Sequence, residues 1–223
     1  MLYLYKNKAQ IIYLGFLYEC KNPNGFEMNI SPISFGKKTP IMKSNIRDVL
    51  QNKSAEVTLS EYDCKDIDDI KEVSKKCGDW TYGGNIAKDM DKKRESYLGG
   101  GEKFPTHFYV VEDKHKNIIG LCETIDIGKD TNVEFLESDR EAGYKYVGQT
   151  MLLAAGKKLL DRGGENLCVA HPYIGALSFY TDKCGFESID DDNHCFSLFM
   201  DKSHIREYID RIQRKTNSAD IKG

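Results

Sequence analysis

The sequence has few prolines and no excess of charge of either sign, and both features limit what the protein can be. Its 223 residues include 5 prolines, 32 basic and 35 acidic residues, giving a formal net charge of -3. The charges are interspersed, so no basic patch points to nucleic acid or an anionic membrane surface. The 40% of hydrophobic residues can fill one sizeable core, and we expect one main domain.

Cysteine pairs at metal-binding or disulfide spacing are also lacking. The sequence has an odd number of cysteines and no C-x-x-C pair. The cysteines are scattered singly: Cys20, Cys64, Cys77, Cys122, Cys168, Cys184 and Cys195. This pattern suits neither a disulfide framework nor a zinc site. It favours a reduced, cytoplasmic setting and predicts no bound metal.

No hydrophobic run is long enough to span a bilayer. The longest, around Ile11 to Tyr18, lies behind Lys6 and Lys8, which gives it a weak likeness to the apolar region of a signal peptide. No small-residue cleavage site follows it. We therefore expect no membrane partner and keep the cytoplasm as the compartment.

The first 53 residues differ in character from the rest. The stretches "QIIYLGFLYE" and "GFEMNISPISFG" flank the turn-prone "KNPNG", which predicts a two-stranded ribbon. An isolated hairpin is marginal in water, so we expect it to dock on the main body or to stay mobile. Met28 is an alternative translation start. We divide the chain into an N-terminal extension (1–53), a main domain (54–202) and a C-terminal helix and tail (203–223).

From Ser54 onward, strand and helix patterns alternate regularly. Period-two and helical spacings predict, in order, a strand, helices, a three-strand meander, a helix, a strand, a helix and two strands. The predicted strands are 55–62, 107–113, 117–128, 132–138, 165–170, 186–189 and 194–201, and the predicted helices are 66–77, 85–98, 149–160, 174–184 and 203–216. The last of these is amphipathic, with Ser203 as its expected cap.

Two stretches could carry chemistry. The first, "GYKYVGQTMLLAAG" (143–156), is a loop that runs into a helix, whose free N–H groups and dipole could hold a pyrophosphate. The same stretch is equally compatible with an ordinary turn before a helix. The second, "ALSFYTDKCGFE" (176–187), places Tyr180 on a short helix that ends at Gly185. A tyrosine there is either a packed aromatic or a proton donor that stays protonated at neutral pH.

Together these stretches resemble the GCN5-related N-acetyltransferases (GNAT). The acetyl-CoA loop of that family reads Arg/Gln-x-x-Gly-x-Gly/Ala before a helix with a paired leucine. Its second signature is Asn-x-x-Ala-x-x-hydrophobic-Tyr-x-x-x-Gly-Phe. The matching residues are Gly148, Met151 and Leu152 in the first stretch and Ala176, Phe179, Tyr180, Gly185 and Phe186 in the second.

The resemblance implies a mixed α/β (α+β) fold: a mostly antiparallel twisted sheet flanked by helices, preceded here by the ribbon and followed by the terminal helix. It also implies acetyl-CoA as cosubstrate, an amine acceptor, and Tyr180 as the acid that protonates the departing thiolate. The residues implied to bind the cofactor are Gly143, Lys145, Tyr146, Val147, Gly148, Gln149, Tyr173 and Ala176.

Three positions depart from the family pattern. Gly143 stands where the family has Arg or Gln, so we expect neighbouring Lys145 to contact phosphate instead. Tyr146 replaces the middle glycine, and we expect it to keep a negative φ with its N–H toward phosphate and its ring turned away. Tyr173 replaces the asparagine of the second signature.

The resemblance also implies a carboxylate on the strand 132–138 that helps to deprotonate the acceptor. Glu134 and Glu137 are the candidates, on opposite faces of a regular strand unless a bulge intervenes. We prefer Glu137, with a solvated face as the alternative role for either residue. Trp80 and Tyr82 are implied to wall the acceptor site or to pack in the core. His171 is more often a structural residue in such a context.

The leading hypothesis is therefore an N-acetyltransferase that moves the acetyl group of acetyl-CoA to a primary amine by direct attack in a ternary complex. The alternative is a module that binds acyl-CoA without turnover. A third hypothesis makes the terminal helix and the ribbon a homodimer interface. The sequence does not identify the amine, because loops shape the acceptor pocket.

Overall fold

The computed structural model describes residues 10–13, 16–19, 31–32, 38–99, 104–170, 172–190 and 196–220. The chain divides into two compact units, Met1–Lys37 and Lys38–Gly223. Met28, Cys20, His171 and Cys195, which the sequence singled out, lie outside the described residues.

The first unit holds a small antiparallel sheet in the order β1 (Gln10–Tyr13), β2 (Phe16–Glu19) and β3 (Ser31–Pro32). We predicted that 10–19 would form a single strand of a two-stranded ribbon. Instead this stretch pairs with itself, Gln10 opposite Glu19, and β3 adds a third strand against β2.

The boundary between the two units falls between residues 37 and 38 of the chain, not at 53 as we expected. The reason is β4 (Thr39–Asp48), which pairs with β5 (Lys53–Tyr62) from Thr39 opposite Glu61 to Asp48 opposite Lys53. Exposed and buried residues alternate along β4, the pattern of a strand with one face on a core. Residues 39–48 therefore belong to the main sheet.

Ten described strands form the main sheet, in the order β11-β12-β10-β8-β7-β6-β5-β4-β13 with β9 paired to β4. Neighbouring strands are antiparallel except β8 and β10, which run parallel. The remaining strands are β6 (Thr106–Glu112), β7 (Ile118–Ile127), β8 (Asp130–Ser138), β9 (Tyr144–Lys145), β10 (Asn166–Ala170), β11 (Glu187–Asp190), β12 (Phe196–Asp201) and β13 (Ala219–Asp220).

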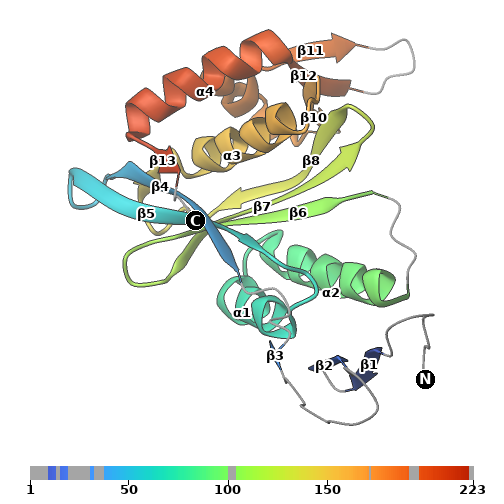
Figure 1. The fold of residues 1–223 in the computed structure, drawn as a ribbon. Coiled ribbons are helices and arrows are strands. Elements are labelled where there is room, and N and C mark those ends of the chain that lie inside the picture. The colour runs from blue at the N-terminus through green and yellow to red at the C-terminus, as the bar shows by residue number, and fades with distance from the viewer. Residues whose placement is uncertain are drawn as a thin grey trace. The chain divides into compact units, whose positions relative to one another are not determined.

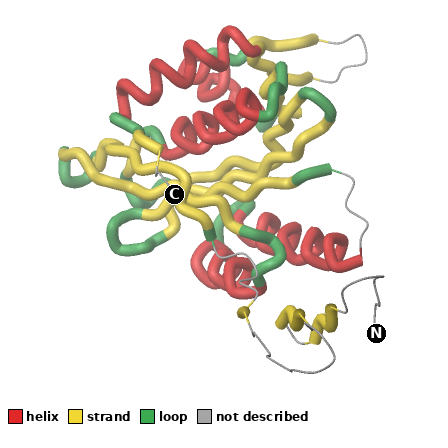
Figure 2. Tube along the Cα trace, in the orientation of Figure 1, coloured by secondary structure: helices red, strands yellow, loops and turns green. Residues whose placement is uncertain are grey.

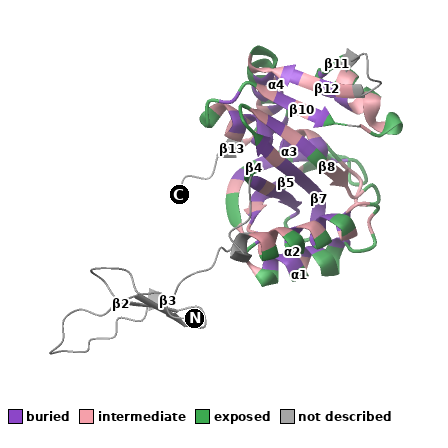
Figure 3. Cartoon of the chain, turned by 90° about the vertical axis from the view of Figure 1, so that its right-hand side faces the viewer, coloured by how far each residue is buried: buried purple, intermediate pink, exposed green. Residues whose placement is uncertain are grey.

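Helices cover both faces of this sheet, with α1 and α2 on one side and α3 and α4 on the other (Figures 1 and 2). Each pair closes its own apolar core, and the central strands are buried between the two (Figure 3). The four helices are α1 (Ile67–Cys77), α2 (Gly83–Gly99), α3 (Val147–Asp161) and α4 (Lys202–Thr216). A 3-10 turn, η1 (Ile174–Ala176), and a π-helix, η2 (Phe179–Cys184), precede β11.

The terminal helix α4 is part of the main body, because it packs on α3 and on β10 and β12. Its apolar stripe, Ile205, Tyr208, Ile209 and Ile212, is buried. Asp201 caps this helix by accepting hydrogen bonds from the backbone N–H groups of Ser203 and His204, so the cap lies two residues before the serine that we expected.

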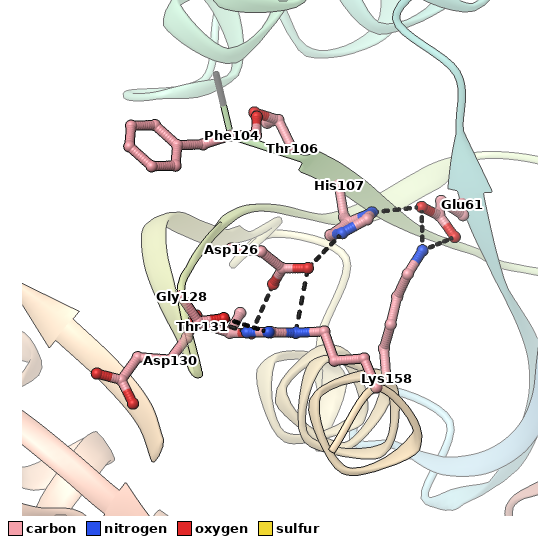
Figure 4. A network of polar contacts seen from close by, with 10 residues as sticks. Glu61, Phe104, Thr106, His107, Asp126, Gly128, Asp130, Thr131 and Lys158 are labelled. Carbon is pink, nitrogen blue, oxygen red and sulfur yellow. Dashed lines mark hydrogen bonds and ion pairs between the residues drawn. The ribbon is translucent and has the colours of Figure 1, made fainter. Parts of the chain in front are cut away.

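A charged network fixes the C-terminal end of α3 to the sheet (Figure 4). Glu61 on β5 accepts hydrogen bonds from Lys158 on α3 at 2.6 and 2.8 Å and faces a ring nitrogen of His107 at 2.8 Å. The other ring nitrogen lies 3.1 Å from Asp126, which also pairs with Arg162 at 3.2 Å. Because a helix rises 1.5 Å per residue, this network lies roughly 16 Å along α3 from its first turn. It sets the direction in which the helix N-terminus points.

Candidate active site

The sheet opens where β8 and β10 part. The two strands pair from Asp130 opposite Asn166 to Val133 opposite Val169, and the pairing ends there. On its other side β8 stays paired with β7 up to Ser138. Among the described residues, no strand pairs with 134–138 on this side of β8, and we call this opening in the sheet the fork.

A bulge at Glu134 re-aims the side chains of β8 at the fork. Val133 pairs with Thr124 and Phe135 with Glu123, which leaves Glu134 as the extra residue. Val133 and Leu136 then pack on the α3 side of the sheet, and Phe135 packs on the α1–α2 side. Without the bulge, Val133 and Phe135 would share a face.

The loop before α3 is held by the β4–β5 hairpin. Gly143 has φ +70, its carbonyl accepts the N–H of Val49, and a Cβ added to it would lie 2.5 Å from Cγ of Leu50. This close approach explains why glycine stands where the GNAT pattern has Arg or Gln. Next in the chain, β9 pairs with the end of β4, with Lys145 opposite Arg47.

Tyr146 adopts the left-handed conformation, with φ 72 and ψ 6, so our expectation of a negative φ was wrong. The chain must leave β9, which is tied to β4, and enter α3 at the next residue. A left-handed N-cap makes that turn, at a cost of about 1 kcal/mol or more for a residue other than glycine. The ring is half-buried and packs against the main core, so it is turned inward.

The side chain of the N-cap residue Tyr146 makes no capping hydrogen bond to α3. The N–H of Thr150 bonds to the carbonyl of Tyr146, and the amides of Val147, Gly148 and Gln149 precede it at the positive end of the helix dipole. Packing explains why residue 148 is a glycine, since an added Cβ would lie 2.9 Å from Cζ of Phe179.

Lys145 and Arg47 are two exposed cations directly opposite each other on β9 and β4, and Arg47 donates a hydrogen bond to Oδ1 of Asn52 at 2.7 Å. Like charges in that position destabilise a strand pair. Arg47 was missed by the sequence reasoning. It lies far upstream in a stretch that we had assigned to the extension, and only the pairing of β4 with β9 brings it here.

Tyr180 lies in η2 and is 6% exposed. Its ring packs edge-on against Phe179 and Phe186, with centroids at 5.1 and 5.6 Å. Burial raises the pKa of its hydroxyl, and Cys122 and Tyr82 add to the shift. Cys122 belongs to the core under α3, whereas Tyr82 starts α2 on the opposite face. Phe179, the ring neighbour of Tyr180, lies against Gly148 in α3, where an added Cβ would also be 3.4 Å from Cδ2 of Leu136 on β8. Tyr180 therefore packs in the same core as the fork strand.

The two candidate glutamates differ sharply in their contacts. Glu137 accepts three backbone hydrogen bonds from the turn before α2, from Thr81 at 3.0 Å, Tyr82 at 2.7 Å and Gly83 at 3.1 Å. This carboxylate acts as a cap for the start of α2. Glu134 is exposed on the bulge.

The other predicted residues lie in the segments that follow β10 and precede α2. Tyr173 is 70% exposed and precedes η1, in which Ala176 is half-buried with its N–H bonded to the carbonyl of Tyr173. Trp80 packs on the core under α1 and α2. The ring of Tyr82 lies 5.9 Å from that of Phe135, next to the fork.

Three comparisons with known proteins bear on this arrangement. The sequence matches no protein-family model and no curated protein. Among solved structures, an acetyltransferase of the GNAT family from Staphylococcus aureus Mu50 is similar with a TM-score of 0.50 and 14% identity, covering 66% of this chain and 99% of that one. The chain has the GNAT fold. A GNAT-family protein from Desulfovibrio desulfuricans gives the same TM-score and coverage at 10% identity. The PaiA N-acetyltransferase from Thermoplasma acidophilum, solved with coenzyme A, gives 0.47 at 20% identity, covering 65% and 98%.

Within this GNAT fold, buried thiols are poor nucleophiles. Burial raises the pKa of Cys168 to about 11 and that of Cys184 to about 12. Among the described residues, no group of three or more His, Cys, Asp or Glu side chains is placed to hold a metal ion. In the same part of the chain, no helix is long and apolar enough to cross a membrane.

Proposed function

We propose that the protein is an acetyl-CoA-dependent N-acetyltransferase that passes an acetyl group to a primary amine by direct attack in a ternary complex. The observation that carries this proposal is the fork between β8 and β10, where Leu136 of β8 and Phe179, the ring neighbour of Tyr180, both lie against Gly148 in the first turn of α3. The GNAT fold and the acetyltransferase among the similar solved structures support it.

The chain offers a fitting place for the pyrophosphate of acetyl-CoA. The amides of Val147, Gly148 and Gln149 would donate to it, and Lys145 and Arg47 would supply positive charge. Gly143 and Tyr146 act indirectly, because their left-handed backbones shape the loop. Tyr173 and Ala176 would line the path of the pantetheine arm past the fork.

The reaction needs few chemical groups from the protein. A backbone amide of β8 at the fork would donate a hydrogen bond to the thioester carbonyl. The amine nitrogen bonds to the carbonyl carbon and the carbon–sulfur bond breaks. Sulfur takes the hydroxyl proton of Tyr180, which is restored by the proton that the amine gives up. Holding both substrates in place can supply roughly 7 to 11 kcal/mol of the barrier.

The amine must first lose the proton that it carries at neutral pH. Of the two glutamates, we assign this step to Glu134, acting directly or through a water molecule. Glu137 already holds three backbone N–H groups, so we assign it the task of positioning Tyr82 and the start of α2. We place the reaction in the cytoplasm, because the odd, scattered cysteines of the sequence suit a reducing compartment.

Incubation with acetyl-CoA and a broad panel of amines, followed by mass spectrometry of the products, tests the activity. We expect an acetylated amine and free CoA in equal amounts. Binding is tested separately by the melting temperature, because a ligand at 100 times its Kd stabilises by about 2.7 kcal/mol. Binding without product would favour the non-catalytic module, and an unmoved melting temperature would reject both hypotheses.

A further inference from the structure

The terminal helix α4 is tied to the short helix that carries Tyr180. Arg211 on α4 donates from Nη2 to the backbone carbonyl of Cys184 at 2.8 Å and to that of Lys183 at 3.3 Å. These carbonyls belong to the last two residues of η2, and the last carbonyls of a helix have no partner within the helix itself. Arg211 therefore caps the end of η2 from a different helix.

The turn that ends η2 also holds the backbone of Tyr180. Gly185, at φ +88, donates its N–H to the carbonyl of Thr181, and Phe186 donates its N–H to the carbonyl of Tyr180, each at 3.0 Å. The segment has six residues with π-helical winding, which is rare and frequent at functional sites. A helix this short is not stable by itself, so the place of Tyr180 depends on what holds η2.

A second residue of α4 connects η2 with the first turn of α3. Tyr208 is buried, and its hydroxyl donates to the carbonyl of Gln149 at 2.9 Å, with Sγ of Cys184 at 4.0 Å. The guanidinium of Arg211 lies over the ring of Tyr208, 5.6 Å from the ring centroid. Tyr208 and Arg211, which we call the α4 clamp, thus hold the end of η2 and the start of α3 together.

We propose that the α4 clamp positions the side chain of Tyr180. This inference rests on the proposed function, in which Tyr180 protonates the departing sulfur. Proton transfer requires the hydroxyl within hydrogen-bond reach of that sulfur, and a displacement of about 1 Å can lower a rate by about 100-fold. Tyr208 and Arg211 act through η2, so they are positioning residues and take no part in the chemistry themselves.

A double-mutant cycle with Tyr180 tests the effect on the reaction. Arg211→Met keeps a long, unbranched side chain and removes its donors. We expect kcat to fall by about 10- to 100-fold, with the Kd for acetyl-CoA within about twofold. In a Tyr180→Phe background the same change should have almost no further effect, because the group that Arg211 positions is already gone. Arg211→Lys, which restores a donor, should recover part of kcat.

The matched control is Arg214→Met on the same helix. Arg214 is exposed, and its Nε donates to the carbonyl of Asp210 within α4. We expect this change to leave kcat within about twofold of the wild-type value.

Amide hydrogen exchange, followed by NMR on the full chain, tests the clamp without any acetyl transfer. The amides of Gly185 and Phe186 close the end of η2, and we expect them to exchange at least tenfold faster in Arg211→Met than in the wild type. Arg214→Met should leave both rates unchanged. If Arg211→Met does not fold, Tyr208→Phe, which removes a single hydroxyl, takes its place in both experiments.

The two experiments separate this inference from the proposed function. Unchanged exchange at the end of η2, or a loss of kcat as large in the Tyr180→Phe background as in the wild type, would overturn the inference. Faster exchange in a protein that acetylates no amine would support the clamp while rejecting the proposed function. Acetyl transfer with unchanged exchange would do the reverse.

Discussion

The carboxylate of Glu137 accepts the backbone N–H of Tyr82 at 2.7 Å and so ties β8 to the start of α2. The tie joins the strand proposed to hold the thioester to the segment that carries Tyr82, whose ring lies 5.9 Å from Phe135. Glu137 is therefore a positioning residue that keeps the acceptor side of the fork in register with β8.

Replacing Glu137 tests this role against that of a base. In Glu137→Gln the amide NH₂ replaces an acceptor oxygen and faces a backbone N–H, so we expect a loss of about 1 to 3 kcal/mol in the free energy of unfolding. KM for the amine should rise, and the acidic limb of the pH–rate profile should stay in place. Glu95→Gln, at an exposed site on α2, serves as the control. An acidic limb that disappears in Glu137→Gln would show that Glu137 is the base after all.

Gly143 should tolerate no side chain. Gly143→Ala combines an unfavourable left-handed backbone with a contact of 2.5 Å to Leu50, and we expect it to destabilise the fold by about 1 to 3 kcal/mol in urea unfolding. Adding Leu50→Ala should recover the share of the lost stability that comes from the contact with Leu50. The share that comes from the left-handed backbone should remain. A stability equal to that of the wild type would contradict the described loop.

Arg47 and Lys145 should act together on the phosphates of acetyl-CoA. We expect Arg47→Ala and Lys145→Ala each to weaken acetyl-CoA binding several-fold and to reduce its dependence on salt. Lys43→Ala is the matched control, because Lys43 lies on the same face of β4 and pairs with Glu56. Binding that responds equally to all three changes would point to a general charge effect instead.

The network at the far end of α3 should make stability depend on pH. Burial raises the pKa of Glu61, but the hydrogen bonds from His107 and Lys158 outweigh it and hold the pKa below its ordinary value. A lowered pKa means that the ionised group stabilises the fold above about pH 4.3, its value in the unfolded chain, and that this contribution is lost as the pH falls through the folded value. Glu61→Gln should cost about 1 to 3 kcal/mol at pH 7.

Denaturant unfolding of both proteins between pH 7 and pH 3 checks this prediction. The difference in stability between wild type and Glu61→Gln should shrink at the acidic end. A difference that stays constant over the whole range would mean that ionised Glu61 adds nothing to the fold.

The sequence predicted most of the main domain because the apolar periodicity of its strands and helices is regular. Helix α1 illustrates this, with buried Ile70 and Val73 at helical spacing after the Asp66 cap. The domain boundary that we predicted at residue 53 was wrong for a physical reason. Strand β4 joins the main sheet because it pairs with β5, and the composition of β4 gives no sign of that pairing.

Site details were less accessible, because they depend on contacts between distant segments. The sequence identified Tyr180 and the loop before α3, yet neither the left-handed Tyr146 nor the position of Arg47 can be read without the pairing of β4 with β9. Glu137 looked like a base because only its strand was visible.

The most direct test of the account is the rate of acetyl transfer by Tyr180→Phe, measured with a saturating amine found in the product screen. We expect kcat to fall by about 100- to 10,000-fold, because the acid that protonates the leaving sulfur is gone. The Kd for acetyl-CoA should stay within about twofold, since the ring remains in its aromatic packing. An unchanged kcat would contradict the assignment of Tyr180 and, with it, the chemistry proposed at the fork.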